Sequence, residues 1–263
     1  MVAGSERQDS SIEIVPIDLG PGVHAAFTTR DGGVSAGPWG GLDLATHVGD
    51  DPVAVAHNRG LVERWVGAPI AWADQVHGAE VFVVTAPPAD RLAPVARADA
   101  LVTGRIDVAV GVLVADCVPV LLADAAAGVV AALHAGRRGL VAGVVQSAVA
   151  AMRDLGAIPG RIRSMIGPSV CGACYEVPSA MRDEVARLVP AARAETSWGT
   201  PSLDLPGGVA AVLGACGVGE VQRLELCTLT DPRFFSHRRS ARRSEPTGRF
   251  AGVIRLAGVS PRS

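Results

Sequence analysis

The stretch VGVLVADCVPVLLADAAAGVVAALHAG, residues 110–136, decides how the rest of the sequence is interpreted. Together with the residues just before it, it contains apolar runs that predict strands at 108–115, 118–123 and 128–134. Runs without polar alternation are typical of a sheet that is covered on both faces. Polar groups stand where two of these strands are expected to stop, at Asp116, Cys117 and His134. An acid, a thiol and an imidazole at strand ends predict a functional site at that end of the strands.

Apolar runs and helical patterns alternate along the remaining chain. Further strands are predicted at 12–19, 23–30, 80–86, 99–103, 161–167, 221–227 and 250–256. Helices are predicted from Asp50-Asp51-Pro52, with its acidic cap and early proline, and at 140–152, 178–189 and 206–215. Strands that alternate with helices, with several consecutive strands in the middle, predict an α/β fold with a mixed sheet. We expect a disordered N-terminal tail at 1–11 and a single catalytic domain at 12–263.

The composition of the 263 residues narrows the classes of function. Hydrophobic residues make up 49% and charged residues 19%, the proportions of an ordinary soluble globular protein. A formal net charge of -2 argues against nucleic acid or an anionic membrane as a partner. Every basic residue is arginine, which excludes lysine nucleophiles. The sequence carries no visible secretory signal, and an odd count of five cysteines favours reduced thiols. We therefore expect a cytoplasmic protein. A monomer is also expected, although no feature of the sequence indicates the oligomeric state.

Two histidines and one cysteine are expected at the ends of the central strands. His77 lies in WADQVHGAEV, just before a predicted strand, while Cys117 and His134 end two others. Two imidazoles and one thiolate, with a fourth position open, are the ligand set of a catalytic zinc site. The same residues suit a cysteine nucleophile with a histidine base, and a cysteine in an apolar run is often only a small buried hydrophobe. Asp116 is interpreted either as orienting one imidazole or as a turn-forming residue.

The turn HAGRRG, which contains His134, predicts a site for an anion. Backbone N–H groups at a helix start bind phosphate, and Arg137 or Arg138 could add charged hydrogen bonds. A second arginine-rich segment, HRRSARRSEPTGR, occupies 237–249. The alternative for both is a set of solvated surface arginines without such a role.

A different zinc chemistry is suggested by Cys171-x-x-Cys174 in SVCGACYEV, together with Glu80 near His77. The zinc deaminases of nucleobases combine these residue types, but their signature needs H-x-E and a proline directly before the first cysteine. Here the glutamate is one position too far along, and Pro168 lies three residues upstream of Cys171. A thioredoxin-like role lacks the βαβ context. We therefore interpret Cys171 and Cys174 as packing residues.

An ordered set of motifs from about residue 22 to 256 resembles the YfiH family, also called the multicopper polyphenol oxidase or laccase-domain family and the peptidoglycan editing factors. The motifs are FTTRDGGVS, THVGDD, QVHG, ADALVT, ADCVPVLLAD, HAGRRG, IGPSVCGACYEV, FFSHRR and TGR. The resemblance implies a single-domain α/β sandwich similar to the catalytic fold of cytotoxic necrotising factor toxins. It also implies that His77, Cys117 and His134 form the active-site metal trio. Arg137 replaces the tryptophan common in H-A-G-W-R-G, and Pro206 stands where an asparagine-containing helix start is usual.

The resemblance also implies a reaction. Family members have been assigned purine nucleoside phosphorolysis, in which adenosine, inosine, guanosine or methylthioadenosine reacts with phosphate to give free base and pentose 1-phosphate. Adenosine deamination has been assigned as well. The expected partners are therefore a purine nucleoside and phosphate, and the expected cofactor is zinc, with copper as the alternative. Arginines suit phosphate, and the candidates are Arg30, Arg138 and Arg249.

The other names of the family imply different chemistry. A multicopper oxidase must hold four coppers, which takes on the order of ten imidazoles, whereas the chain has six histidines. This count excludes a laccase for the isolated chain. A cysteine-dependent amidase acting on peptidoglycan precursors, with Cys117 as nucleophile and His134 as base, stays open and should tolerate chelators. A partner-binding protein without catalysis would require the trio to be dispensable, and is the least favoured interpretation.

Overall fold

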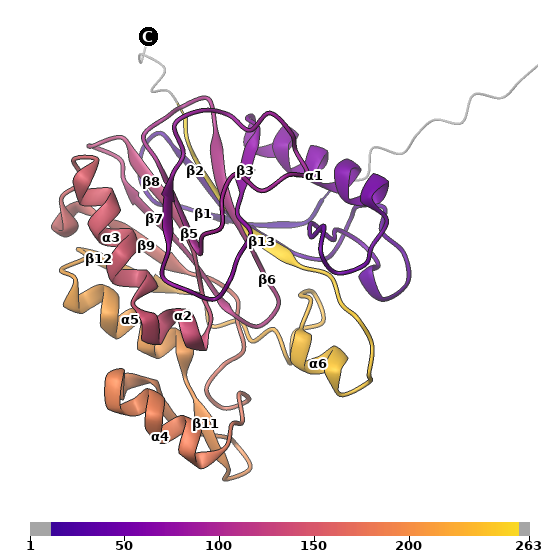
Figure 1. The fold of residues 1–263 in the computed structure, drawn as a ribbon, viewed down its shortest axis with the longest axis vertical. Helices are drawn as coiled ribbons and strands as arrows, with labels where there is room; N and C mark the ends of the chain where they lie inside the picture. Colours follow the sequence, from indigo (N-terminus) through magenta and orange to yellow (C-terminus); the bar gives the residue numbers. More distant parts are fainter. Residues whose placement is uncertain (1–11, 258–263) are drawn as a thin grey trace, which may run out of the picture.

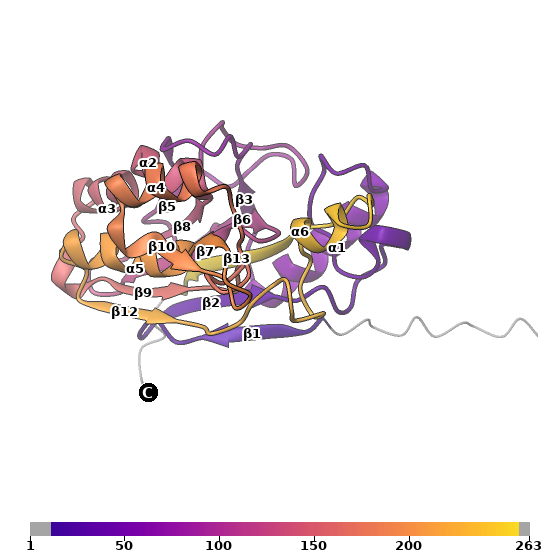
Figure 2. The same cartoon turned by 90° about the horizontal axis from the view of Figure 1, so that it is seen from below.

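The computed structural model describes residues 12–257, which form two β-sheets packed face to face, with helices on both outer sides. Figures 1 and 2 show the strands in the middle of the molecule, with α3 (Val144–Asp154) and α5 (Leu205–Ala215) on one side and α1 (Pro52–Val66) on the other. The predicted tail at 1–11 and the last residues, 258–263, lie outside the described residues. This arrangement confirms the predicted α/β class with mixed sheets.

The first sheet contains the last strand of the described chain at its centre. Its order is β1 (Ile14–Ile17), β2 (Val23–Thr28), β13 (Phe250–Leu256), β6 (Ala109–Val114) and β3 (Ile70–Trp72). β3 runs parallel to β6, and the other neighbours are antiparallel. The C-terminal strand therefore joins the N-terminal hairpin to the middle of the chain.

The second sheet carries the stretch that opened the sequence analysis. Its order is β12 (Glu220–Arg223), β9 (Arg163–Ile166), β7 (Val118–Asp124), β8 (Val129–Ala135), β5 (Ala100–Thr103) and β4 (Val81–Val83). The two outermost pairs are parallel, and the three central pairings are antiparallel. In the β7–β8 hairpin, Pro119 pairs with His134. This pairing brings Cys117 and His134 to the same end of the two strands. A separate ribbon consists of β10 (Arg193–Glu195) and β11 (Pro201–Leu203).

The central strands are apolar throughout because each of their faces meets a different layer. In β8, Val130 and Ala132 belong to the core between the sheets, whereas Ala131 and Leu133 belong to the core beneath the helices. The helices on this side are α2 (Arg137–Ala142), α3, α4 (Ser179–Leu188) and α5, and a short α6 (His237–Ala241) lies apart from them. Single 3-10 turns occupy Gly37–Trp39, Pro159–Arg161 and Pro190–Ala192. Burial on both faces is what the unbroken apolar runs predicted.

The structure differs from the sequence-based expectations in several short elements. The helix predicted at 140–152 begins earlier and is split into α2 and α3 at Gly143, whose φ of +94° is readily adopted only by glycine. β3, β10, β11 and α6 were not predicted, because three to five residues are too few for a periodic pattern. Within residues 12–257, none of the helices combines the length and the apolar character that a membrane crossing needs.

Phe27 fills space between the two sheets, and the strand residue paired with it is glycine. A Cβ at Gly252 would lie 2.9 Å from the Phe27 ring, which is too close for two carbon atoms. We expect Gly252→Ala to lower the free energy of unfolding by about 1–3 kcal/mol, as measured by urea denaturation. Gly214→Ala in α5 is the control, because its Cβ would meet no atom within 4 Å and alanine favours helices. Equal stability of the two variants would contradict this account of the core.

Candidate metal centre

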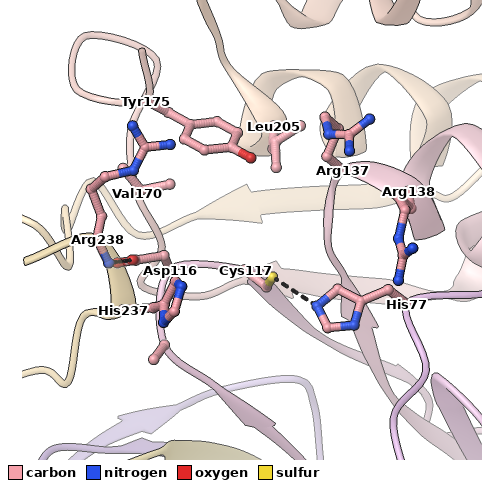
Figure 3. A pocket seen from close by; sticks show the side chains of 11 residues that line it. His77, Asp116, Cys117, Arg137, Arg138, Val170, Tyr175, Leu205, His237 and Arg238 are labelled. Atoms are coloured by element: carbon pink, nitrogen blue, oxygen red, sulfur yellow. Dashed lines mark hydrogen bonds between the residues drawn. The ribbon is translucent and has the colours of Figure 1, made fainter. Parts of the chain in front are cut away.

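His77, Cys117 and His134 lie close together where β7 begins and β8 ends, at one end of the central strands of the second sheet. Together they are called the trio. One potential ligand atom of each lies within 4.8 Å of the others. His77 Nε2 is 3.8 Å from Cys117 Sγ (Figure 3). The two imidazole rings meet edge to face, with centroids 4.7 Å apart. The structure therefore brings together the three residues that the sequence singled out, although they belong to three separate segments.

Two residues of the site region have left-handed backbone conformations that L-amino acids rarely adopt. His77, in the loop between β3 and β4, has a φ of 60°, and Asp116, between β6 and β7, has a φ of 88°. The Asp116 carboxylate accepts hydrogen bonds of 2.6 Å from Thr228 Oγ1 and from the backbone N–H of Arg238. Asp116 therefore ties the corner before Cys117 to two later segments, and the hypothesis that it orients an imidazole is wrong.

Asp99, and not Asp116, is the carboxylate that orients an imidazole of the trio. Its carboxylate is fully buried and accepts the Nδ1–H of His134 at 2.8 Å. It also accepts the backbone N–H groups of Val76, His77 and Gly78 at 3.2, 2.9 and 2.7 Å. One carboxylate thus holds the left-handed loop of His77 and fixes the proton of His134 on Nδ1, which leaves Nε2 as the ligand atom. The sequence analysis missed this role. The available signal was an acidic residue at the start of an apolar strand, because a carboxylate buried there requires a charged or hydrogen-bonding partner.

The charges of the site favour a thiolate at neutral pH. Burial alone would raise the pKa of Cys117, but the charge of His134 and hydrogen bonds from both imidazoles outweigh it and lower the pKa to about 6. Burial would lower the pKa of His134, but Cys117 and Asp99 outweigh it and raise the pKa to about 9. For Asp99, burial is likewise outweighed, mainly by the His134 hydrogen bond, so its pKa is lowered. A thiolate is the form of cysteine that binds metals or attacks electrophiles.

The trio has suitable spacing and room for one metal ion. Zinc bonds to sulfur of 2.3 Å and to nitrogen of about 2.0 Å at a tetrahedral angle would separate those ligands by about 3.6 Å, close to the observed 3.8 Å between His77 and Cys117. A Cβ at Gly136 would lie 2.9 Å from His77 Cδ2 and 3.0 Å from Cys117 Sγ. The space between the three side chains exists because residue 136 is glycine. Two imidazoles and a thiolate suit zinc and copper alike.

Two hollows flank the trio. The first, called the Tyr175 hollow, measures about 240 Å³, and its lining includes Tyr175, Val170, Leu205, Arg137, Arg138 and Arg238. Figure 3 shows the tyrosine ring and these arginines around the space next to Cys117 and His77. The second, called the Arg249 hollow, measures about 250 Å³, and its lining includes Arg249, His47, Gln75 and His134. Both hollows share His77, Ala115, Cys117 and His237, so two members of the trio face both hollows, whereas His134 lines the Arg249 hollow alone.

The predicted arginines occupy three different environments. Arg138 lines the Tyr175 hollow, and Arg249 lines the Arg249 hollow. The Arg30 guanidinium lines neither; it lies 4.7 Å from the centroid of the Phe235 ring and donates to the carbonyl of Gly40. Sequence reasoning missed Tyr175 as a lining residue. It also missed Arg238, whose guanidinium lies 5.1 Å from the Tyr175 ring. Both belong to motifs quoted above, but nothing in their spacing marked them as neighbours.

Gly136 is expected to control metal binding. Gly136→Ala would insert a methyl group among the three ligand side chains at a cost of about 1–3 kcal/mol, so the zinc affinity should fall about tenfold or more. The affinity is measured by competition with a chromogenic chelator. Gly160→Ala is the control, because its Cβ would meet no atom within 4 Å. Equal affinities of the two variants would refute this role of Gly136.

Asp99 is expected to act on the metal through both imidazoles. Asp99→Asn removes the charge that fixes His134, and we expect a 10–100-fold loss of zinc affinity by the same competition assay, roughly what other partners of ligating histidines contribute. Asp107→Asn, at an exposed carboxylate paired with Arg105, provides the control. A variant at Asp99 that binds zinc as tightly as this control would show that the carboxylate only supports the fold.

Known proteins match this chain over most of its length. The family model described as multi-copper polyphenol oxidoreductase laccase matches residues 24–257. A purine nucleoside phosphorylase of Streptomyces coelicolor is 54% identical over 89% of this chain and 96% of its own length. One of Mycobacterium tuberculosis is 47% identical over 88% of this chain and 91% of its own length.

Solved structures share the fold as well. A Neisseria meningitidis protein superposes with a TM-score of 0.82 at 37% identity, covering 94% of this chain and 99% of that one. The YfiH protein of Bacillus licheniformis has a TM-score of 0.81 at 30% identity, covering 89% and 92%. The resemblance inferred from the sequence motifs is confirmed, and the chain belongs to the multi-copper polyphenol oxidoreductase laccase family, together with the YfiH proteins.

Proposed function

We propose that the protein is a purine nucleoside phosphorylase, which transfers the pentose of a purine nucleoside to phosphate and releases the free base. The observation that carries the proposal is the closeness of relatives with that name, which are 41% to 54% identical over 88% to 89% of this chain. The two hollows that meet at His77 and Cys117 support it, because the reaction joins two substrates at one centre. Adenosine, inosine, guanosine and methylthioadenosine are the candidate nucleosides.

The Tyr175 hollow is the proposed site for the nucleoside. The ring of Tyr175 offers a flat face for a purine, and Val170 and Leu205 offer apolar walls. Arg137 stands in this lining where the family commonly has tryptophan. A guanidinium can stack on a base as an indole does, but it also carries charge and donates hydrogen bonds. We therefore expect the base preference of this chain to differ from that of relatives with tryptophan.

Phosphate is proposed to bind to an arginine beside the trio. Arg138 and Arg249 are the candidates, because each lines one of the two hollows and can form charged hydrogen bonds with an oxyanion. Arg30 is not part of this proposal, since it lines neither hollow.

In phosphorolysis a phosphate oxygen attacks the anomeric carbon of the sugar. The bond from that carbon to purine N9 breaks, and its electron pair leaves with the base. Protonation of the purine on N7 makes it a better leaving group, which is the task of a general acid. His237 is the proposed donor, because its side chain lines both hollows.

The trio is proposed to hold zinc. A zinc ion there would supply a Lewis acid that polarises a bound oxygen, the chemistry that an additional adenosine deaminase activity would need. Within that site, Asp99 holds His134 through Nδ1, and the loop of His77 through three backbone N–H groups. Asp99 thus orients the His134 imidazole and positions the loop of His77 before any metal binds, and the same ligands would suit copper.

A cysteine-dependent amidase is the second candidate function. The specific observation in its favour is the chain Cys117–His134–Asp99, in which a low-pKa thiol, an imidazole and a buried carboxylate follow one another as in cysteine hydrolases. Peptidoglycan precursors are its proposed substrates.

A laccase is not proposed. Among the described residues, the groups of three or more potential metal ligands are the trio and a cluster of three cysteines. Neither offers the many imidazoles that four coppers require.

The first experiment is a chromatographic assay of the purified protein with adenosine and inosine, with and without phosphate. We expect free base to appear only with phosphate, to vanish in Cys117→Ala, and to persist in Cys216→Ala, a cysteine outside the trio. A metal chelator should abolish the reaction, because zinc held by the trio would supply a Lewis acid beside both hollows. If zinc-loaded protein releases no base, the phosphorylase proposal fails. Hydrolysis of a peptidoglycan amide that resists the chelator would then favour the amidase.

A further inference from the structure

A second cluster of metal-ligating side chains lies away from the trio. Cys171, Cys174 and Cys227, called the cysteine cluster, have sulfur atoms that all lie within 4.8 Å of one another. The first two belong to one turn, in which the N–H of Cys174 donates to the carbonyl of Cys171 at 3.0 Å. The third follows β12, far along the chain. The interpretation of Cys171 and Cys174 as packing residues is therefore incomplete, because spacing could not reveal Cys227.

The arrangement of the three sulfur atoms suits a single ion. Zinc–sulfur bonds of 2.3 Å at a tetrahedral angle separate two sulfur atoms by about 3.8 Å, and two cysteines spaced as C-x-x-C commonly share one zinc. The backbone N–H of Cys171 points at Cys227 Sγ, at 3.5 Å. An N–H donor of this kind stabilises negative charge on a ligating sulfur.

The cluster is open on one side. A hollow of about 180 Å³ is lined by Cys171 and Cys227, together with Ser169 and Glu225. This space provides an entry path for an ion and room for a fourth ligand. Three thiolates form a soft donor set, which selects thiophilic ions such as zinc over magnesium or calcium.

We propose that Cys171, Cys174 and Cys227 bind a thiophilic metal ion, zinc in the first instance, at a structural site separate from the trio. Binding replaces S–H bonds by sulfur–metal bonds and releases the protons to solvent, without any change of oxidation state. The proposal does not depend on the phosphorylase reaction.

The site would brace one wall of the Tyr175 hollow. Val170 and Tyr175 lie on the segment that carries Cys171 and Cys174. The segment of Cys227 continues to Thr228, whose N–H donates to the carbonyl of Ser169 at 3.1 Å and whose hydroxyl donates to Asp116 beside Cys117. An ion held by both segments would add coordinate bonds to the hydrogen bonds that join them.

The test uses Cys117→Ser protein, in which the trio has lost its thiolate, under reducing conditions. Titration with Co²⁺ should produce a sulfur-to-cobalt charge-transfer band that saturates at one ion per chain. Adding Cys227→Ser should weaken binding at least about tenfold, since a soft ligand is lost. Adding Cys216→Ser, the control, should change nothing. The proposal is overturned if no thiolate band appears, or if the two double variants bind alike.

A second measurement avoids substitutions. Wild-type protein is alkylated with iodoacetamide, with and without Zn²⁺, and each cysteine is quantified by mass spectrometry. Zinc should protect Cys171, Cys174 and Cys227 together and leave Cys216 as reactive as before. Equal alkylation with and without zinc would overturn the proposal. So would a disulfide between two of the three in freshly isolated protein that reductant does not open, because those sulfur atoms would not be free to bind.

Discussion

Four hydrogen-bond donors converge on the buried carboxylate of Asp99, and the positions of both imidazoles depend on them. A left-handed residue such as His77 costs about 1–3 kcal/mol. A hydrogen bond to a charged group contributes about 1.5–3 kcal/mol, so the three backbone bonds to Asp99 outweigh that strain. The donors in turn offset the cost of burying the carboxylate. The buried charge of Asp99 and the left-handed loop of His77 therefore stabilise each other. The positions of the two imidazoles of the trio depend on this pair.

The site is assembled where several chain segments reach the same edge of the sheets. Cys117 directly precedes β7 and His134 lies in the adjacent strand β8 of the second sheet, whereas His77 comes from the connection between the sheets. His237 and Arg238 come from α6, and Asp116 ties this segment to the corner before Cys117. Strand β8 carries His134 and β7 begins directly after Cys117, whereas the first residues of α2, α5 and α6 supply much of the wall of the Tyr175 hollow. Residues that line the hollow, such as Arg137, can therefore differ between relatives and alter substrate preference, while the three proposed ligands stay the same.

The local sequence pattern predicted a mixed sheet covered on both faces and drew attention to the trio, whereas the sandwich of two sheets was implied only by the family resemblance. Apolar runs without alternation mark strands with two buried faces, and reactive side chains at their ends stand out against that background. Asp99 could not be chosen over Asp116 in this way, because both are acids next to apolar strands and only the three-dimensional path decides which meets the imidazoles. Cys227 and Tyr175 were missed for the same reason. β3 was missed because three residues carry too little pattern.

The central place of β13 has a consequence for synthesis on the ribosome. β2 and β6 are both paired to it and not to each other, so the first sheet lacks its middle until residues 250–256 have emerged. Arg249, which directly precedes this strand, reaches its hollow only then. Contacts of such long sequence separation form late and slowly. A nascent chain that already carries His77, Cys117 and His134 therefore still lacks the finished pocket until β13 has emerged and paired with β2 and β6.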